Sequence, residues 1–291
     1  RLVDAVVEES EINSQNIHNV SVARGPGLLG SLLVGLGMAK GLVISTGANL
    51  IGVNHLTAHL LGSELEENIS FPALGVLISG GHTQIYRMDS RFEISLLGKT
   101  LDDAMGEAFD KTAKLLNLPY PGGKYIDELA CFSEPDKEMF PNLYLDNQNL
   151  DFSFSGLKTA VSNYLNKNNI SLSKLRPYPD SESLARENPE LSKLCASFNW
   201  TVANTLYIKL KRALERNKDV RSLVMAGGVA SNSFLRETIR QLAQEFSIYP
   251  ILPKQSLCTD NAAMIAYTGY LLARQGYSHD LSVEGIPRGK S

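Results

Sequence analysis

The sequence predicts an α/β protein that binds a nucleotide, and two patterns support this. Short apolar segments typical of buried strands alternate with longer segments of helical periodicity, as in a sheet covered by helices. Glycine-bearing turns follow or join those strands at Gly25, Gly80, Gly122 and Gly227. Backbone N–H groups at such turns can surround a phosphate. Each turn alone is a weak signal, but together they favour a protein with two lobes around a nucleotide.

The composition is that of a water-soluble globular protein. The chain has 291 residues, enough for one large domain or two medium ones. Its net charge of −3 gives no general attraction to nucleic acid, so RNA contact would need a local basic patch. Three widely spaced cysteines argue against a disulfide framework and fit a reducing compartment. We expect a cytoplasmic protein, with an organellar location as the alternative. We expect no stretch of the chain that is long and apolar enough to cross a membrane.

The first segments predict the end of a helix, a strand and a glycine-rich helix. Residues 1–8 are amphipathic, lack a signal-peptide layout and begin at Arg1, so we expect that the native N-terminus is missing. A short buried strand at 21–23 leads through Gly25-Pro26-Gly27 into an apolar helix at 28–42. For Gly25 and Gly27, close packing and approach to a phosphate are equally expected, whereas packing is favoured for the later glycines.

A histidine pair follows the next predicted strand, residues 50–53. His55 and His59 stand four apart at the start of an apolar helix, and such residues lie on one face, close enough to share a metal ion. For the bare pair we favour ordinary packed or surface histidines at roughly two to one. A metal site needs a third ligand, and Asp260, near the start of the last predicted helix, is the best carboxylate available.

A hairpin is predicted from an apolar strand at 73–79, a turn at Gly80-Gly81 and a second strand at 82–86. Its tip, with Ser79, exposes backbone N–H groups, so we weakly favour phosphate binding over a plain turn. His82 is either a ligand or a residue on the strand surface, and the second interpretation is favoured.

The next segment predicts a helix that opens at Thr100 with a capping-box spacing and keeps a core face to residue 116. Asp103, Glu107 and Asp110 share another face. They form either a solvated stripe paired with lysines or acceptors for substrate hydroxyls, and the sequence favours the stripe. A turn at 120–123 precedes a short helix at 125–129. Residues 132–152 are predicted as loop, and 165–189 as a polar surface excursion.

A long helix is predicted to begin at Asn188, as its cap, and Pro189. Its end carries the densest basic cluster in the chain: Lys209, Lys211, Arg212, Arg216, Lys218 and Arg221. We interpret this cluster as a solvated helix end, with RNA contact as the alternative. A strand at 222–226 then enters the Gly227-Gly228 turn and another helix. The last helix begins within 258–264, capped by Thr259 or Asp260.

Seven motifs in one order make the chain similar to a known family. The motifs are Ala23-Arg24-Gly25-Pro26-Gly27-Leu28, Asn54-His55-Leu56-Thr57-Ala58-His59, Ser79-Gly80-Gly81-His82-Thr83-Gln84, Asp103-Ala104-Met105-Gly106-Glu107-Ala108-Phe109-Asp110-Lys111, Phe152-Ser153-Phe154-Ser155-Gly156-Leu157-Lys158, Met225-Ala226-Gly227-Gly228-Val229 and Cys258-Thr259-Asp260-Asn261. In these motifs the chain resembles the tRNA threonylcarbamoyladenosine synthase family of the bacterial TsaD type.

The resemblance implies an actin-like, sugar-kinase and Hsp70-related (ASKHA) fold with two α/β lobes around a central cleft. Residues 1–72 with 259–291 would form the first lobe, and 73–258 the second. The implied activity is transfer of threonylcarbamoyl from an adenylate to the exocyclic amine of the adenosine beside the anticodon, in tRNAs that read codons beginning with A. The family's opening segment Gly-Ile-Glu-Thr-Ser-Cys-Asp has no counterpart here, so we expect an incomplete first lobe with an unpaired sheet edge.

The resemblance also implies the site residues and the partners. His55, His59 and Asp260 match the family's metal ligands, and such a set favours Fe(2+) over Zn(2+). The positions that match its substrate-binding residues are Leu77, Ile78, Ser79, Gly80, Gly81, Asp110, Gly123, Asp127 and Asn232. An adenine nucleotide or threonylcarbamoyl-adenylate is the expected ligand, and no general base is assigned. The implied partners are tRNA, an inactive paralogue of TsaB type and a small ATPase of TsaE type, with a homodimer also open.

Three rival functions remain as alternatives. A metalloprotease of the His-Glu-x-x-His type is disfavoured, because Leu56 follows His55 where the general base would stand. An ATP-dependent small-molecule kinase would have the same fold class. A non-catalytic partner subunit would not need His55, His59 and Asp260 together.

Overall fold

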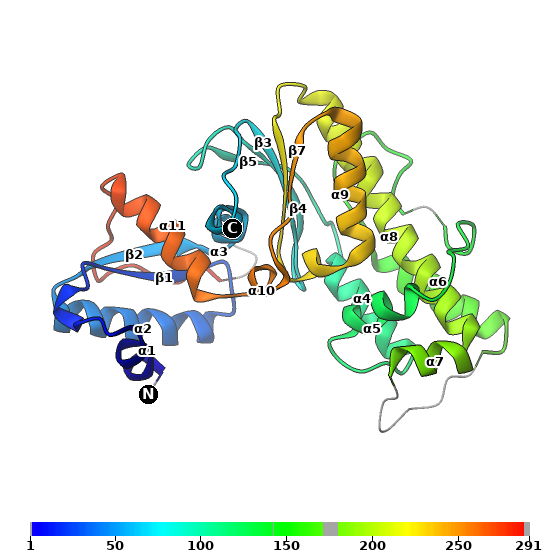
Figure 1. The fold of residues 1–291 in the computed structure, drawn as a ribbon, viewed down its shortest axis with the longest axis horizontal. Coiled ribbons are helices and arrows are strands. Elements are labelled where there is room, and N and C mark those ends of the chain that lie inside the picture. Colours follow the sequence, from blue (N-terminus) through cyan, green and yellow to red (C-terminus); the bar gives the residue numbers. More distant parts are fainter. Residues whose placement is uncertain (1, 142, 171–179, 288–291) are drawn as a thin grey trace. The chain divides into compact units, whose positions relative to one another are not determined.

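The protein, seen in a computed structural model, is described over residues 2–141, 143–170 and 180–287. Its helices and strands alternate, so the predicted α/β class is confirmed (Figure 1). The chain divides into two compact units, Arg1–Leu65 with Asp260–Ser291 (unit 1) and Glu66–Thr259 (unit 2).

Unit 1 is built on two parallel strands, β1 (Asn19–Gly25) and β2 (Asn49–Asn54). Successive strand residues point to opposite faces. Leu50 therefore packs with Leu36 on one side of the sheet, while Ile51 packs with Met264 on the other. Figure 1 shows α2 and α11 on these two faces. The helices of the unit are α1 (Leu2–Ser10), η1 (Ser14–Asn16), α2 (Leu29–Thr46), α3 (His55–Leu61), η2 (Gly62–Leu65) and α11 (Ala262–Arg274).

The C-terminal segment of unit 1 packs back onto this sheet. The N–H of His279 donates to the Leu50 carbonyl at 2.8 Å, and that of Ile286 donates to the Arg24 carbonyl at 2.6 Å. Gly25 has φ of 133°, and a Cβ there would lie 2.3 Å from the Ile286 carbonyl oxygen. This glycine therefore allows close packing, which is one of the two alternatives that the sequence left open.

Helix α2 corrects one expectation from the sequence. It is long and apolar enough, by length and composition only, to cross a membrane. Within unit 1 it packs by one side, on which Leu32, Leu36 and Ala39 are buried. Its other side carries exposed large apolar side chains: Leu29, Leu33, Val34, Met38 and Ile44.

Unit 2 contains a five-stranded mixed sheet in the order β5-β4-β3-β6-β7. The strands are β3 (Ala73–Ile78), β4 (Thr83–Met88), β5 (Ile94–Lys99), β6 (Ser222–Ala226) and β7 (Tyr249–Ile251). The first three pair antiparallel, and β3, β6 and β7 pair parallel. The hairpin of β3 and β4 confirms the prediction. The sequence reasoning missed β5 and β7, which are edge strands and half exposed.

The helices of unit 2 surround one large apolar core in which Phe109 and Phe198 meet edge to face at 5.1 Å between ring centres. They are α4 (Met105–Leu115), α5 (Gly122–Ala130), α6 (Ser155–Lys167), α7 (Ser181–Glu187), α8 (Pro189–Arg216), η3 (Gly228–Ser231), α9 (Ser233–Phe246) and α10 (Gln255–Cys258). The predicted core face of α8 is buried throughout. The predicted loop at 132–152 contains no helix or strand in its described part.

One predicted helix start and one predicted helix cap are wrong. Helix α4 begins at Met105 and not at Thr100, whose hydroxyl donates to the Asp103 carbonyl at 2.6 Å. The Asp102 carboxylate accepts from the N–H of Phe154 and Ser155 at the start of α6. Helix α8 begins as predicted, with Asn188 at the N-cap position and Pro189 in its first turn, although the Asn188 side chain makes no capping hydrogen bond. Helix α11 is capped by Asn261, whose Oδ1 accepts from the Met264 N–H at 2.9 Å.

The predicted excursion at 165–189 also needs correction. It contains the end of α6 and all of α7, while residues 171–179 lie outside the described part of the chain.

Candidate metal centre and substrate cavity

The histidine pair lies on the first turns of α3 in unit 1. Helix α3 starts where the sequence predicts, because Asn54 Oδ1 accepts from the N–H of Leu56 and Thr57 at 2.9 and 3.1 Å. The four-residue spacing places the two imidazoles on one face, with 4.7 Å between ring centres. His59 is nearly buried and His55 is partly exposed.

Asp260 joins the pair from the start of α11, also in unit 1. Its Oδ1 lies 3.3 Å from Nε2 of His55 and 3.0 Å from Nε2 of His59. Because Asn261 caps α11, the Asp260 carboxylate is not used as a cap. Hydrogen bonds from His55 and His59 hold the pKa of Asp260 far below its usual range, against an opposing effect of desolvation. The carboxylate is therefore ionised and available as a ligand.

This donor set fits a divalent metal ion. One ligand atom from each of the three side chains lies within 4.8 Å of the others. Ligand atoms held about 2.0–2.2 Å from one ion are separated from each other by a little over 3 Å, which matches the His–Asp contacts. Two imidazoles and one carboxylate leave open coordination positions, a pattern suited to Fe(2+) or Zn(2+).

A cavity of about 590 Å³ lies within unit 2, at the ends of β3 and β6. Five predicted substrate-binding residues line it: Gly80, Asp110, Gly123, Asp127 and Asn232. Leu77 and Ile78 do not, because both side chains are fully buried in β3.

The remaining two predicted positions shape the hairpin turn. Ser79 and Gly81 are not among the residues that line the cavity. The Ser79 hydroxyl accepts from the N–H of Gly81 and His82 at 3.3 and 3.1 Å, so it closes the turn that presents Gly80.

The three acidic residues of the segment 103–110 have different roles. Lys111 bridges Asp103 and Glu107 at 2.6 and 2.8 Å, so these two carboxylates form the solvated ion-pair stripe that the sequence favoured. Asp110 departs from that interpretation. Its Oδ1 accepts from the Gly122 N–H at 2.8 Å, at the start of α5, and the side chain lines the cavity.

Asp127 ties α5 to the start of α9. Its two carboxylate oxygens accept from the Ser233 N–H at 3.0 and 3.2 Å, and Oδ1 also accepts from the Ser233 hydroxyl at 2.8 Å. Burial raises the pKa of Asp127, partly offset by these bonds from Ser233. Its position in the cavity wall is therefore fixed by another element of unit 2.

Gly227 brings β3 and the start of η3 together. Its φ is 94°, and a Cβ there would lie 2.4 Å from the Ile78 carbonyl oxygen. The turn can therefore pass β3 closely and place Gly228, Val229 and Ser231 in the cavity wall.

Other residues of the cavity wall were not predicted as substrate-binding. Tyr120 and Lys124 line the cavity at the glycine turn 120–123, of which the sequence had indicated only the glycines as ligand-binding. Gln255 and Thr259 also line it, and no sequence pattern pointed to either in this role.

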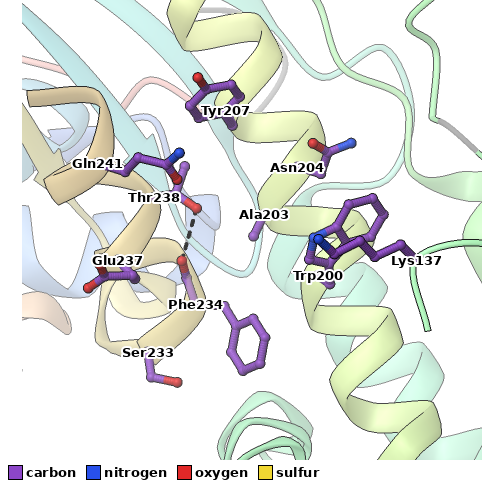
Figure 2. Close-up of a pocket in the computed structure, with 10 residues that line it drawn as sticks. All are labelled: Lys137, Trp200, Ala203, Asn204, Tyr207, Ser233, Phe234, Glu237, Thr238 and Gln241. Carbon is purple, nitrogen blue, oxygen red and sulfur yellow. Dashed lines mark hydrogen bonds between the residues drawn. The ribbon is translucent and has the colours of Figure 1, made fainter. Parts of the chain in front are cut away.

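A second cavity, of about 620 Å³, opens between α8 and α9 (Figure 2). Trp200 and Tyr207 of α8 and Phe234 of α9 line it, with Ala203 between the helices. Ser233 contributes to this wall and also holds Asp127, which faces the first cavity. The two cavities of unit 2 therefore share the Asp127–Ser233 contact as part of the wall between them.

The predicted basic cluster on α8 is largely occupied by internal contacts. Lys209 is fully buried and donates to Asn147 Oδ1 and to both oxygens of Asn149 at 2.9–3.2 Å. Arg212 donates to the carbonyls of Leu145 and Asn147. Arg216 and Lys211 bond to Gln148 and Glu245. Most of this cluster thus holds the 145–149 loop and a neighbouring helix.

Comparison with known proteins gives a consistent result. A family model for TsaD, the tRNA N6-adenosine threonylcarbamoyltransferases, matches residues 1–267. The chain is 53% identical over 290 residues to the tRNA N6-adenosine threonylcarbamoyltransferase of Maridesulfovibrio salexigens, covering 99% of this chain and 82% of that protein. It is 51% identical over 290 residues to the same enzyme of Desulfovibrio desulfuricans, covering 100% and 80%.

Among solved structures, HypF of T. kodakarensis is similar in fold. The TM-score is 0.58 at 12% sequence identity, over 94% of this chain and 43% of that one. At this identity the likeness concerns the fold alone.

Proposed function

This chain belongs to the tRNA N6-adenosine threonylcarbamoyltransferase family, and we propose that the unit 2 cavity binds its acyl donor, threonylcarbamoyl-adenylate. The protein is an acyltransferase that modifies the N6 amine of an adenosine in tRNA. The observation that carries this function is the sequence identity of 53% and 51% to two such enzymes over nearly the whole chain. In our proposal the modified adenosine stands beside the anticodon of tRNAs that read codons beginning with A.

The polar groups of the cavity suit an adenylate. Asp110 and Asp127 offer carboxylate oxygens that accept hydrogen bonds from ribose hydroxyls. Gly123 and Lys124 stand in the first turn of α5, where backbone N–H groups and a cationic side chain attract a phosphate. Tyr120, on the same wall, offers a ring face to an adenine.

The transfer itself needs little covalent chemistry from the protein. The adenosine amine attacks the carbamoyl carbon, the new C–N bond forms, and the bond from that carbon to the phosphate oxygen breaks. AMP leaves, and the amine releases one proton. Because the adenylate is already activated, the residues act by holding both reactants in line and by excluding water.

We further propose that His55, His59 and Asp260 hold one divalent ion, with Fe(2+) favoured over Zn(2+). When bound, such an ion supplies positive charge that attracts phosphate or carbonyl oxygens. Leu56 after His55 leaves no general base of the metalloprotease type, so peptide hydrolysis is not favoured.

The fold and partner proposals concern the whole chain. The fold likeness and the family support an ASKHA arrangement in which the two units are lobes that border a cleft.

For the partners we propose a paralogous TsaB-type subunit and a TsaE-type ATPase. The exposed apolar side chains of α2 support such a contact, because a patch of that kind is typical of a protein interface. The expected location is the cytoplasm.

Reconstitution tests the function directly. The protein, its partner subunits and the adenylate-forming enzyme are incubated with tRNA, threonine, bicarbonate and ATP, and tRNA nucleosides are analysed by mass spectrometry. We expect threonylcarbamoyladenosine in the complete mixture and none when this chain is omitted. If the complete mixture yields only unmodified adenosine, the function is refuted. A phosphorylated metabolite formed from ATP would instead favour a kinase.

A further inference from the structure

We propose that Asn199, in the middle of α8, is a positioning residue that fixes the orientation of the Asn232 amide in the wall of the substrate cavity. Asn199 is fully buried and does not line the cavity, whereas Asn232 does. The inference rests on the proposed function, because that function makes the cavity ligand an adenylate.

Two contacts determine how the Asn232 amide is oriented. Its Oδ1 accepts from the Leu235 N–H at 3.0 Å, and its Nδ2 donates to Asn199 Oδ1 at 2.9 Å. A flipped amide would place oxygen against oxygen at Asn199 and N–H against N–H at Leu235, so both bonds would be lost. The amide is planar, so the N-cap bond and the bond to Asn199 select the same orientation. Asn199 is the residue that holds the nitrogen in that orientation.

Asn199 is itself held by a second element of the cavity wall. Its Nδ2 lies 3.5 Å from the Ile126 carbonyl oxygen, on α5, next to Asp127. Helix α8 packs against both α5 and α9, so this amide lies between the two helices that border the cavity. A buried amide is costly unless it is hydrogen-bonded, and an apolar side chain is the usual occupant of such a place. The two hydrogen bonds of the Asn199 amide explain why a polar side chain occupies this buried position.

The orientation has a chemical consequence for the ligand. An Asn amide has two N–H groups, and Asn199 uses one of those on Asn232. The second N–H has no partner among the residues that the structure describes. Because Asp110 and Asp127 supply acceptors, Asn232 adds a donor to the same wall. A donor there selects an acceptor on the ligand, and the phosphate or carbamoyl oxygens of the adenylate are of that kind.

Three variants of the full chain test this role, with AMP binding measured by calorimetry and steady-state kinetics measured with the adenylate. Asn199→Leu removes the amide, and we expect AMP to bind about tenfold more weakly and KM to rise by the same factor, since one oriented hydrogen bond is lost. The turnover number kcat should stay within about twofold. Asn199→Asp keeps an acceptor for the Asn232 nitrogen but loses the donor to the Ile126 carbonyl, so it should bind AMP more tightly than Asn199→Leu does. If it binds AMP as weakly as Asn199→Leu, the orientation role is wrong.

Thr201→Val is the matched control. Thr201 is also buried on α8, but its hydroxyl donates to the Ser197 carbonyl within the same helix. We expect unchanged AMP binding for this variant. Trp200, the single tryptophan of the chain, follows Asn199, so its fluorescence reports whether α8 keeps its packing in each variant. If Asn199→Leu does not fold, Asn199→Ala removes the same amide without added bulk and carries the same expectation.

A double-mutant cycle separates positioning from a general structural effect. Asn232→Ala should weaken AMP binding, and adding Asn199→Leu to it should cause no further loss, because Asn199 acts through Asn232. Additive losses, or equal weakening by Thr201→Val, would overturn the inference while tRNA modification by the parent chain still stands. A parent chain that modifies no tRNA but binds AMP in an Asn199-dependent way would refute the function and keep the inference. A parent chain that does not bind AMP refutes the inference.

Discussion

Individual residues decide whether the metal centre is possible. The sequence offered Thr259 or Asp260 as the cap of the last helix, but Asn261 takes that role. The Asp260 carboxylate therefore does not cap the helix, and both histidines lie within 3.3 Å of it. If the helix started one residue earlier, the Asp260 carboxylate would cap it and bond to the backbone of α11. Because Asn261 is the cap, the Asp260 carboxylate is available as a metal ligand.

Removal of a single ligand tests the proposed metal site. We expect the parent chain, loaded anaerobically with Fe(2+) and desalted, to retain about one ion, and His59→Ala or Asp260→Asn to retain less than about a tenth of that. Metal content is measured by mass spectrometry. His82→Ala is the matched control, because His82 lies outside the cluster, and it should retain the ion. Full metal content in His59→Ala would contradict the site.

One exposed carboxylate gives a prediction about acid stability. Arg87 on β4 donates to both oxygens of Asp219, at 2.9 and 2.7 Å, and these bonds lower the pKa of Asp219 to about 2 from 3.8. The folded state therefore binds this proton less readily than the unfolded state. The stability from this contact is complete well above pH 3.8 and is lost as the pH falls towards 2.

Urea unfolding at several pH values tests this contact. Asp219→Asn should lower the urea midpoint relative to the parent near neutral pH, and the two midpoints should converge as the pH approaches 2. Arg87→Met should show the same pH dependence, because it removes the partner. A difference that persists unchanged at the lowest pH would show that the contact is not the cause.

At the scale of elements, the basic end of α8 mainly holds the 145–149 loop in place. Lys209 is fully buried, so this lysine is not a solvated surface charge, and burial lowers its pKa to about 8. It packs over the Tyr144 ring at 5.2 Å and bonds to the 147–149 segment. This arrangement disfavours the alternative in which the cluster contacts RNA.

Replacing this lysine should affect the loop rather than tRNA binding. Lys209→Met leaves the Asn147 and Asn149 oxygens without their donor, so we expect faster amide hydrogen exchange over residues 144–149. The free energy of unfolding should fall by about 1–3 kcal/mol. The affinity for tRNA and its dependence on salt should stay within about twofold. A tRNA affinity that drops strongly, with unchanged hydrogen exchange, would restore the RNA-contact interpretation.

At the scale of the whole molecule, α2 has two different faces. Leu32, Leu36 and Ala39 are buried in unit 1, while Leu33 and Val34 are 57% and 75% exposed. Exposed apolar residues on one helix face are typical of a site that another protein covers. The composition alone indicated neither the exposed apolar face of α2 nor a helix long and apolar enough to cross a membrane.

Charged substitutions on the exposed face test the partner proposal. Leu33→Asp with Val34→Asp should abolish co-purification with the paralogous subunit and change the free energy of unfolding by less than about 0.5 kcal/mol. Leu36→Ala is the control on the buried face and should cost about 2–4 kcal/mol of stability. Association that survives both aspartates would place the partner contact elsewhere.

The sequence by itself determined the α/β class, the β3–β4 hairpin, the core face of α8 and the start of α3 at His55, because these depend on local periodicity and capping. It also identified the family, through motifs that follow one another along the chain.

Only the tertiary structure decided which polar residues meet. Gln255 and Thr259 join the cavity wall, Asp102 holds the start of α6 instead of opening α4, and Asn199 reaches Asn232. Such contacts connect residues far apart in the chain, and local propensity carries no information about them. The physical reason is that a buried polar group must be paired, and the packing of the elements determines its partner.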